Sequence, residues 1–192
     1  MFIIMMEMKV KGTEIISLKM FVESRFGEDG FAKWLAALDE ETQYVVQFAM
    51  ASSWYPAEQM FAVPGRRMCE LFFPDDLEEG AREWGRAGAD RELTGVYRLL
   101  VRVGSTNMML STAADKWPMF YNTATLRPVV NEKHHALLRL EGSPVSDILW
   151  ANAVAGWLER ALAMSGVRDA RVDITQTTEG GLSVFEFNLT WR

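Results

Sequence analysis

In residues 143–166 the hydrophobic side chains recur at helical spacing, and this is the clearest helix pattern in the chain. The sequence predicts Ser143 or Ser146 as the N-cap, Pro144 in the first turn and Gly166 at the end. The predicted buried stripe consists of Trp150, Val154, Trp157, Leu158 and Ala161.

Strand patterns flank this helix on both sides. Residues 169–192 predict a hairpin that turns at Gly180-Gly181, because the last strand alternates apolar and polar side chains without interruption. Before the helix, "ATLRPVV" and "HHALLRL" predict two strands joined by a turn at residues 131–133. The predicted order is therefore strand-strand-helix-strand-strand.

In the N-terminal half, the hydrophobic residues recur at helical spacing instead. Residues 13–26 predict one helix, which Gly27 ends, and "EDGFAKWLAAL" predicts a second. Residues 39–53 are ambiguous between a short helix and a strand. "SSWYPAEQMF" predicts a loop, with Pro56 in the first turn of a further helix.

That further helix is expected to break or kink at Pro64-Gly65 and to resume in "RRMCELFF". The acidic residues 74–95 predict a solvated surface helix or loop. Residues 96–115 predict another helix, perturbed near Gly104-Ser105 and ended by Trp117-Pro118. Helices followed by this arrangement of strands define an α+β fold.

Composition narrows the class of protein. A chain of 192 residues that is 49% hydrophobic and 24% charged is typical of a single globular domain. The net charge of -6 argues against binding to nucleic acid or to anionic membranes. One cysteine, Cys69, fits a reducing cytoplasm. The apolar start lacks the features of a signal peptide, no stretch predicts a membrane span, and residues 1–7 are interpreted as a tail or an upstream start.

Two stretches carry a family resemblance. "VKGTEIISLKMFVESRFGEDGFAKWL" resembles the opening of H-NOX domains and of an uncharacterised myxobacterial paralogous family. "GWLERALAMSGVRDARVDITQTTEGGLSVFEFNLTW" resembles the end of 4-vinyl reductase domains. Both groups belong to the superfamily of the TRAPP small subunits. The resemblance spans residues 8–192 as one domain, and it implies a helical layer on a four-stranded antiparallel sheet, with a pocket between the layers.

The resemblance raises the question of haem. H-NOX domains hold haem through a histidine on the helix before the strands and through a tyrosine-serine-arginine motif, but "NMMLSTAADKWPMFY" has no histidine and the motif is absent. The two histidines, His134 and His135, are adjacent in a predicted strand, where neighbouring side chains point to opposite faces. We therefore expect structural histidines, no haem, no metal site and no cofactor.

Other chemistry finds little support in the sequence. The final hairpin lacks the cysteines of many 4-vinyl reductase domains, and no phosphate-binding glycine motif occurs. Some TRAPP subunits carry an acylated cysteine in a hydrophobic channel, so Cys69 is a candidate lipid site, although an inert core position is the more common role for such a residue. No catalytic constellation is predicted.

Aromatic and methionine side chains in the middle of the chain suit an apolar pocket, although most such residues are ordinary core. The leading hypothesis is a non-enzymatic sensory or scaffold domain, dimeric, that binds a small apolar ligand or a protein partner. The alternative is a 4-vinyl-reductase-like enzyme or accessory protein acting on a tetrapyrrole or an aromatic molecule. The predicted ligand-binding residues are Trp117, Phe120, Tyr121, Met108, Met109 and Cys69.

Overall fold

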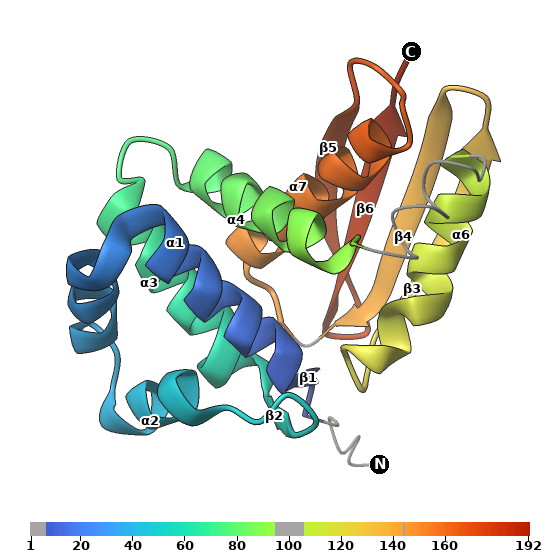
Figure 1. Cartoon of the computed structure of the whole chain (residues 1–192). Helices are drawn as coiled ribbons and strands as arrows, with labels where there is room; N and C mark the ends of the chain where they lie inside the picture. The colour runs from blue at the N-terminus through green and yellow to red at the C-terminus, as the bar shows by residue number, and fades with distance from the viewer. Residues whose placement is uncertain (1–6, 95–105, 144) are drawn as a thin grey trace.

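A computed structural model describes residues 7–94, 106–143 and 145–192 of the chain. Figure 1 shows α7 and α6 against one face of a sheet, α4 across α7, and α1 and α3 beyond α4. The elements before the sheet are β1 (Lys9–Lys11), α1 (Gly12–Ala36), α2 (Glu40–Phe48), β2 (Trp54–Pro56), η1 (Glu58–Ala62), α3 (Val63–Phe72), α4 (Leu77–Glu92), α6 (Thr106–Lys116) and η2 (Trp117–Met119). The remaining elements are β3 (Thr125–Glu132), β4 (His135–Ser143), α7 (Ile148–Met164), β5 (Arg171–Glu179) and β6 (Leu182–Thr190). The α+β class and the strand-strand-helix-strand-strand order are confirmed.

The sheet is antiparallel, in the order β3-β4-β6-β5. Its inner face is apolar because alternate residues of the central strands are hydrophobic and point to that face. Leu138 of β4 lies opposite Phe187 of β6, and Leu140 lies opposite Phe185. The β5–β6 hairpin turns where predicted, and Gly180 and Gly181 both adopt positive φ, at 59° and 82°. The inner face thus forms the floor against which α6 and α7 pack.

At the N-terminus one helical prediction is confirmed and one ambiguity is resolved. Gly27 interrupts α1 with a φ of 70° and a non-helical ψ, so the chain kinks there as expected. Within the ambiguous residues 39–53, Glu40–Phe48 forms the helix α2, and residues 49–53 lie outside any helix. The N-cap of α2, Asp39, accepts a hydrogen bond of 3.0 Å from the backbone N–H of Thr42.

The acidic stretch is the main correction. Residues 74–95 were expected to be solvated, but α4 lies between α1 and α7, and only its outward face is exposed. Glycines allow the close packing: a Cβ at Gly85 would lie 1.8 Å from the Ala153 carbonyl oxygen, and one at Gly156 would lie 2.2 Å from that of Arg82. Ion pairs from Arg82 and Arg86 to Glu159 join the same two helices. The charged side chains therefore lie beside the contact between α4 and α7, and the two helices can approach closely there because Gly85 and Gly156 have no side chains.

Four smaller predictions change. Trp54–Pro56 is a strand that pairs with β1, not a loop. Asp147, not Ser143 or Ser146, caps α7, because its carboxylate accepts a 2.8 Å hydrogen bond from Leu149 N–H. His134 lies in the β3–β4 turn at a φ of 67°, so only His135 is in a strand. Pro64 lies in the first turn of α3, after the π-helical turn η1, so the irregular turn precedes the proline. Pro144 and residues 96–105 lie outside the described part of the chain.

Candidate ligand-binding cavity

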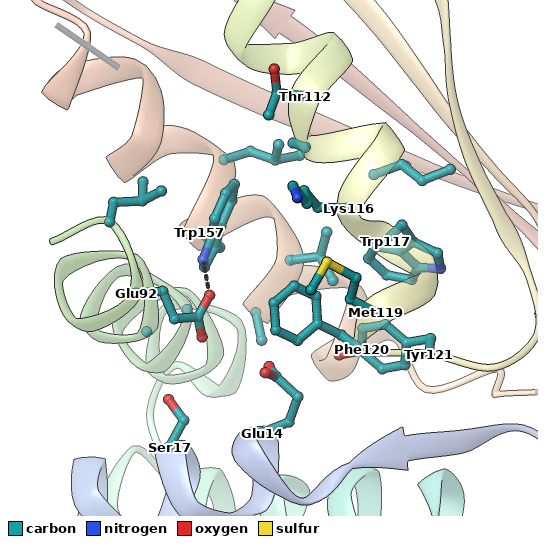
Figure 2. A pocket seen from close by; sticks show the side chains of 18 of the residues that line it. Glu14, Ser17, Glu92, Thr112, Lys116, Trp117, Met119, Phe120, Tyr121 and Trp157 are labelled. Atoms are coloured by element: carbon teal, nitrogen blue, oxygen red, sulfur yellow. Dashed lines mark hydrogen bonds between the residues drawn. The ribbon is translucent and has the colours of Figure 1, made fainter. Parts of the chain in front are cut away.

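A cavity of about 480 Å³ lies between the helices and the sheet. Figure 2 shows side chains from α1, α4, α6 and α7 and from the segment after α6 converging on it. Most of the lining is apolar, and aromatic rings make up much of its wall: Phe61, Trp84, Trp117, Phe120, Tyr121, Trp150 and Trp157. This size and character are typical of small-molecule sites in proteins.

The end of α6 builds one wall. Pro118 ends the helix in the 3₁₀ turn η2, and this turn stacks Trp117 on Tyr121 with ring centroids 4.3 Å apart. Trp150 of α7 meets Tyr121 edge-on at 5.7 Å and donates a 3.4 Å hydrogen bond from Nε1 to its hydroxyl. The backbone is fixed as well, because Lys11 N–H donates to the Phe120 carbonyl at 2.8 Å. The aromatic wall is therefore anchored to β1 and to α7.

Helices α4 and α7 build the opposite wall. Trp84 packs edge-on against Phe61, with ring centroids 5.0 Å apart. A Cβ at Gly88 would meet its nearest atom, Trp157 Cδ1, at 3.7 Å, so a methyl group would fit there in ordinary van der Waals contact. Gly88 belongs to the lining. The glycines of α4 therefore differ: Gly85 permits close packing against α7, whereas Gly88 lines the cavity without a close backbone contact.

Two carboxylic acids face this apolar space. Glu14 of α1 and Glu92 of α4 both line the cavity, and Glu92 accepts a hydrogen bond of 2.9 Å from Trp157 Nε1 (Figure 2). Burial, helped by the neighbouring charge of Glu92, raises the pKa of Glu14 to about 8. Burial also raises the pKa of Glu92, although the Trp157 hydrogen bond opposes this shift. At neutral pH the cavity therefore favours the neutral form of Glu14.

Five of the six residues predicted to bind ligand are brought together at this cavity. Met108 and Met109 line it from α6, followed by Trp117, Phe120 and Tyr121. Cys69 is not among the lining residues: it is fully buried on α3. Burial, with a smaller contribution from Asp147, raises the pKa of the Cys69 thiol to about 12, so the group stays protonated at neutral pH.

Sequence reasoning missed Glu14, Glu92, Trp84 and Trp157 as lining residues. Trp157 was predicted only as core. Glu92 was assigned to the solvated stretch, and its environment depends on α4 packing across α7. The available signal was the run of small residues in α4 at helical spacing, Gly80-Ala81, Gly85 and Gly88-Ala89, which marks a face in close contact with other helices.

The histidines lie away from the cavity. His134 is exposed at its turn, and His135 Nε2 makes a 2.8 Å hydrogen bond with Asn188 Oδ1 across β4 and β6. Neither belongs to the lining. Within residues 7–94, 106–143 and 145–192, no group of three His, Cys, Asp or Glu side chains is placed to hold a metal ion.

Comparison with solved structures decides the fold. Over 95% of this chain and 96% of the other, the structure matches the Fe(II) unliganded H-NOX protein from K. algicida with a TM-score of 0.70 at 12% identity. This chain has the H-NOX fold. A phenylalanine-to-leucine variant of Tt H-NOX matches with a TM-score of 0.71 at 12% identity, covering 95% of both chains.

A third H-NOX structure is an oxygen-binding domain related to soluble guanylate cyclases, in its oxygen complex. It matches with a TM-score of 0.61 at 14% identity over 95% of both chains. No protein-family model and no curated protein sequence matches this chain. Among the described helices, none is long and apolar enough to cross a membrane.

Proposed function

We propose that this protein, which has the H-NOX fold, is a non-enzymatic sensory domain. It binds a small apolar ligand in the cavity between its helices and its sheet, and it holds no haem. The observation that carries the proposal is the aromatic-lined cavity of about 480 Å³. Its walls are anchored by hydrogen bonds and ring contacts, so the cavity is largely formed before a ligand enters.

The lining does not fit a histidine-bound haem. The resemblance to H-NOX domains places the haem ligand on the helix before the strands, which here is α6, and α6 contains no histidine. Haem also carries two propionate groups, which would lose hydration beside Glu14 and Glu92 and gain no opposite charge from them. Among the described lining side chains Lys116 is the basic one, and the tyrosine-serine-arginine motif is absent from the sequence.

The lining also supports a binding role rather than catalysis. Neither histidine nor cysteine occurs among the lining residues, and Tyr121, the lining phenol, has its pKa raised well above its usual value by burial. A 4-vinyl-reductase-like activity would need a proton donor or nucleophile in contact with substrate. Glu14 and Glu92 are the described lining acids that could donate a proton, and no imidazole or thiol accompanies them.

The test is a fluorescence titration with N-phenyl-1-naphthylamine, a neutral apolar probe that brightens in apolar surroundings. The wild type is expected to bind one equivalent. Ala113→Trp, which adds a ring inside the cavity, should abolish the signal, because Ala113 is a lining residue. Asp115→Trp adds the same ring at an exposed position of the same helix and should leave it unchanged. Equal probe binding by both variants, or none by the wild type, would refute the proposal.

A further inference from the structure

The cavity has an acidic end. Glu14 and Ser17 reach it from α1, and Glu92 reaches it from α4, whereas Lys116 and Thr112 lie towards the other end (Figure 2). A Cβ at Gly88 would lie 3.8 Å from Glu92 Oε1 and 3.9 Å from Ser17 Oγ, so these polar atoms flank one point of the wall. Aromatic rings of Phe120 and Trp157 lie beside this end.

In the part of the chain that the structure describes, the cations near these acids or in the cavity lining are Arg91 and Lys116. From α4, Arg91 lowers the pKa of both acids less than burial raises it, and Arg91 is not among the lining residues. From α6, Lys116 is exposed. Tyr121 contributes a phenol, which carries no positive charge, and from α7 Trp157 donates one neutral hydrogen bond to Glu92. Among residues 7–94, 106–143 and 145–192, no cation is therefore paired with the two carboxyl groups inside this apolar space.

We infer that the natural ligand is an apolar amine, a protonated ammonium head on an aliphatic or aromatic body, with the head held by Glu14 and Glu92. The inference rests on the proposed function and adds the chemical class of the ligand. An ammonium group donates three hydrogen bonds, which suits two carboxylates and the Ser17 hydroxyl on one side. The rings of Phe120 and Trp157 add cation–π attraction, and the rest of the cavity takes the apolar body.

The geometry also disfavours the other head groups. A carboxylate head would lose its hydration in an apolar space and would gain no opposite charge from Glu14 or Glu92. A neutral alcohol would make hydrogen bonds but would leave the acids without a counter-charge. The ammonium group is the head that lets both acids ionise, because each carboxylate then gains an opposite charge within hydrogen-bond reach.

The experiment is displacement of bound N-phenyl-1-naphthylamine from the full chain by decylamine, decanol and decanoate, all below their micellar concentrations. These competitors share one chain and differ in the head. Decylamine is expected to compete at least about tenfold better than decanol, since a charge-assisted hydrogen bond contributes more than a neutral one. Decanoate should be the weakest.

Variants assign the effect to the acidic end. Glu14→Gln and Glu92→Gln should each remove most of the preference for decylamine over decanol. Glu78→Gln removes the same charge from an exposed position of α4 and should keep the preference. The preference should also weaken below pH 8, because binding must then displace the proton held by Glu14, and Glu14→Gln should flatten this pH dependence.

Equal displacement by decylamine and decanol in the wild type would overturn the inference and leave the proposed function intact, and this comparison needs no variant. A preference that persists in both glutamine variants would also overturn it. If the wild type binds no probe at all, the proposed function and the inference fail together.

Discussion

At the scale of single residues, Glu14 has an environment that departs strongly from that expected for its residue type. Its folded pKa of about 8 lies above the ordinary value of 4.5, so the folded state holds a proton that the unfolded state releases. The stabilising contribution of this proton is complete below pH 4.5 and is lost as the pH rises through 8.

The free energy of unfolding of the wild type should therefore fall by about 2–4 kcal/mol between pH 5 and pH 9 from this group alone. Glu14→Gln, which stays neutral at every pH, should remove that part of the decline. Urea titrations of both proteins at several pH values check this. Identical pH profiles would contradict the assigned environment of Glu14.

Truncation of Phe120 tests whether this side chain belongs to the cavity wall or to the core. Phe120 lines the cavity and is half-buried, whereas Phe185 is fully buried against the sheet. Phe185→Ala should cost about 3–5 kcal/mol, as truncation of buried phenylalanine does. Phe120→Ala should cost about 1–2 kcal/mol, because fewer packing contacts are lost, and it should change the affinity for the apolar probe.

Chemical denaturation of the two variants, with probe titration of each, gives both readouts. Equal destabilisation by the two truncations, with unchanged probe binding in Phe120→Ala, would assign Phe120 to the core.

At the scale of elements, the sequence predicts best where the pattern is local. The β5–β6 hairpin, the kink at Gly27 and the end of α6 at Trp117 follow from glycine, proline and strict alternation of side chains. The cap of α7 was wrong because Ser143, Ser146 and Asp147 all suit an N-cap, and only the backbone path selects Asp147. The strand Trp54–Pro56 was missed because its partner, β1, lies far away in sequence.

Helix α4 shows the limit of composition as a guide. Its charges predicted a solvated surface, yet Gly85 is close enough to α7 that a Cβ would lie 1.8 Å from a backbone oxygen. The exposed charges lie on one face and the small residues on the other, so the average polarity of the stretch conceals a buried side.

This helix crossing gives a matched pair of glycine substitutions. Gly85→Ala should destabilise by about 3 kcal/mol or more, because backbone atoms of α7 must move. Gly88→Ala meets nothing closer than 3.7 Å, so it should be neutral or stabilise by up to about 1 kcal/mol through helix propensity. Thermal unfolding of the two variants compares them, and equal stability would mean that α4 and α7 do not cross at Gly85.

At the scale of the whole molecule, the order of helices and strands was enough to predict the α+β class and the sheet. The resemblance to H-NOX domains predicted that the segment after α6 lines a cavity, and Trp117, Phe120 and Tyr121 do line one. Their role in binding remains a prediction. The acidic end could not be predicted, because Glu14 and Glu92 are distant in sequence and meet only when α1, α4 and α7 pack together.

Native mass spectrometry of the freshly purified protein tests the central claim most directly, because it reports haem, small ligands and the oligomeric state together. We expect a dimer that carries one small non-covalent apolar molecule per chain and no haem, with the molecule missing from Ala113→Trp. A haem adduct would contradict the account, as would a ligand-free protein that also takes up no added apolar probe.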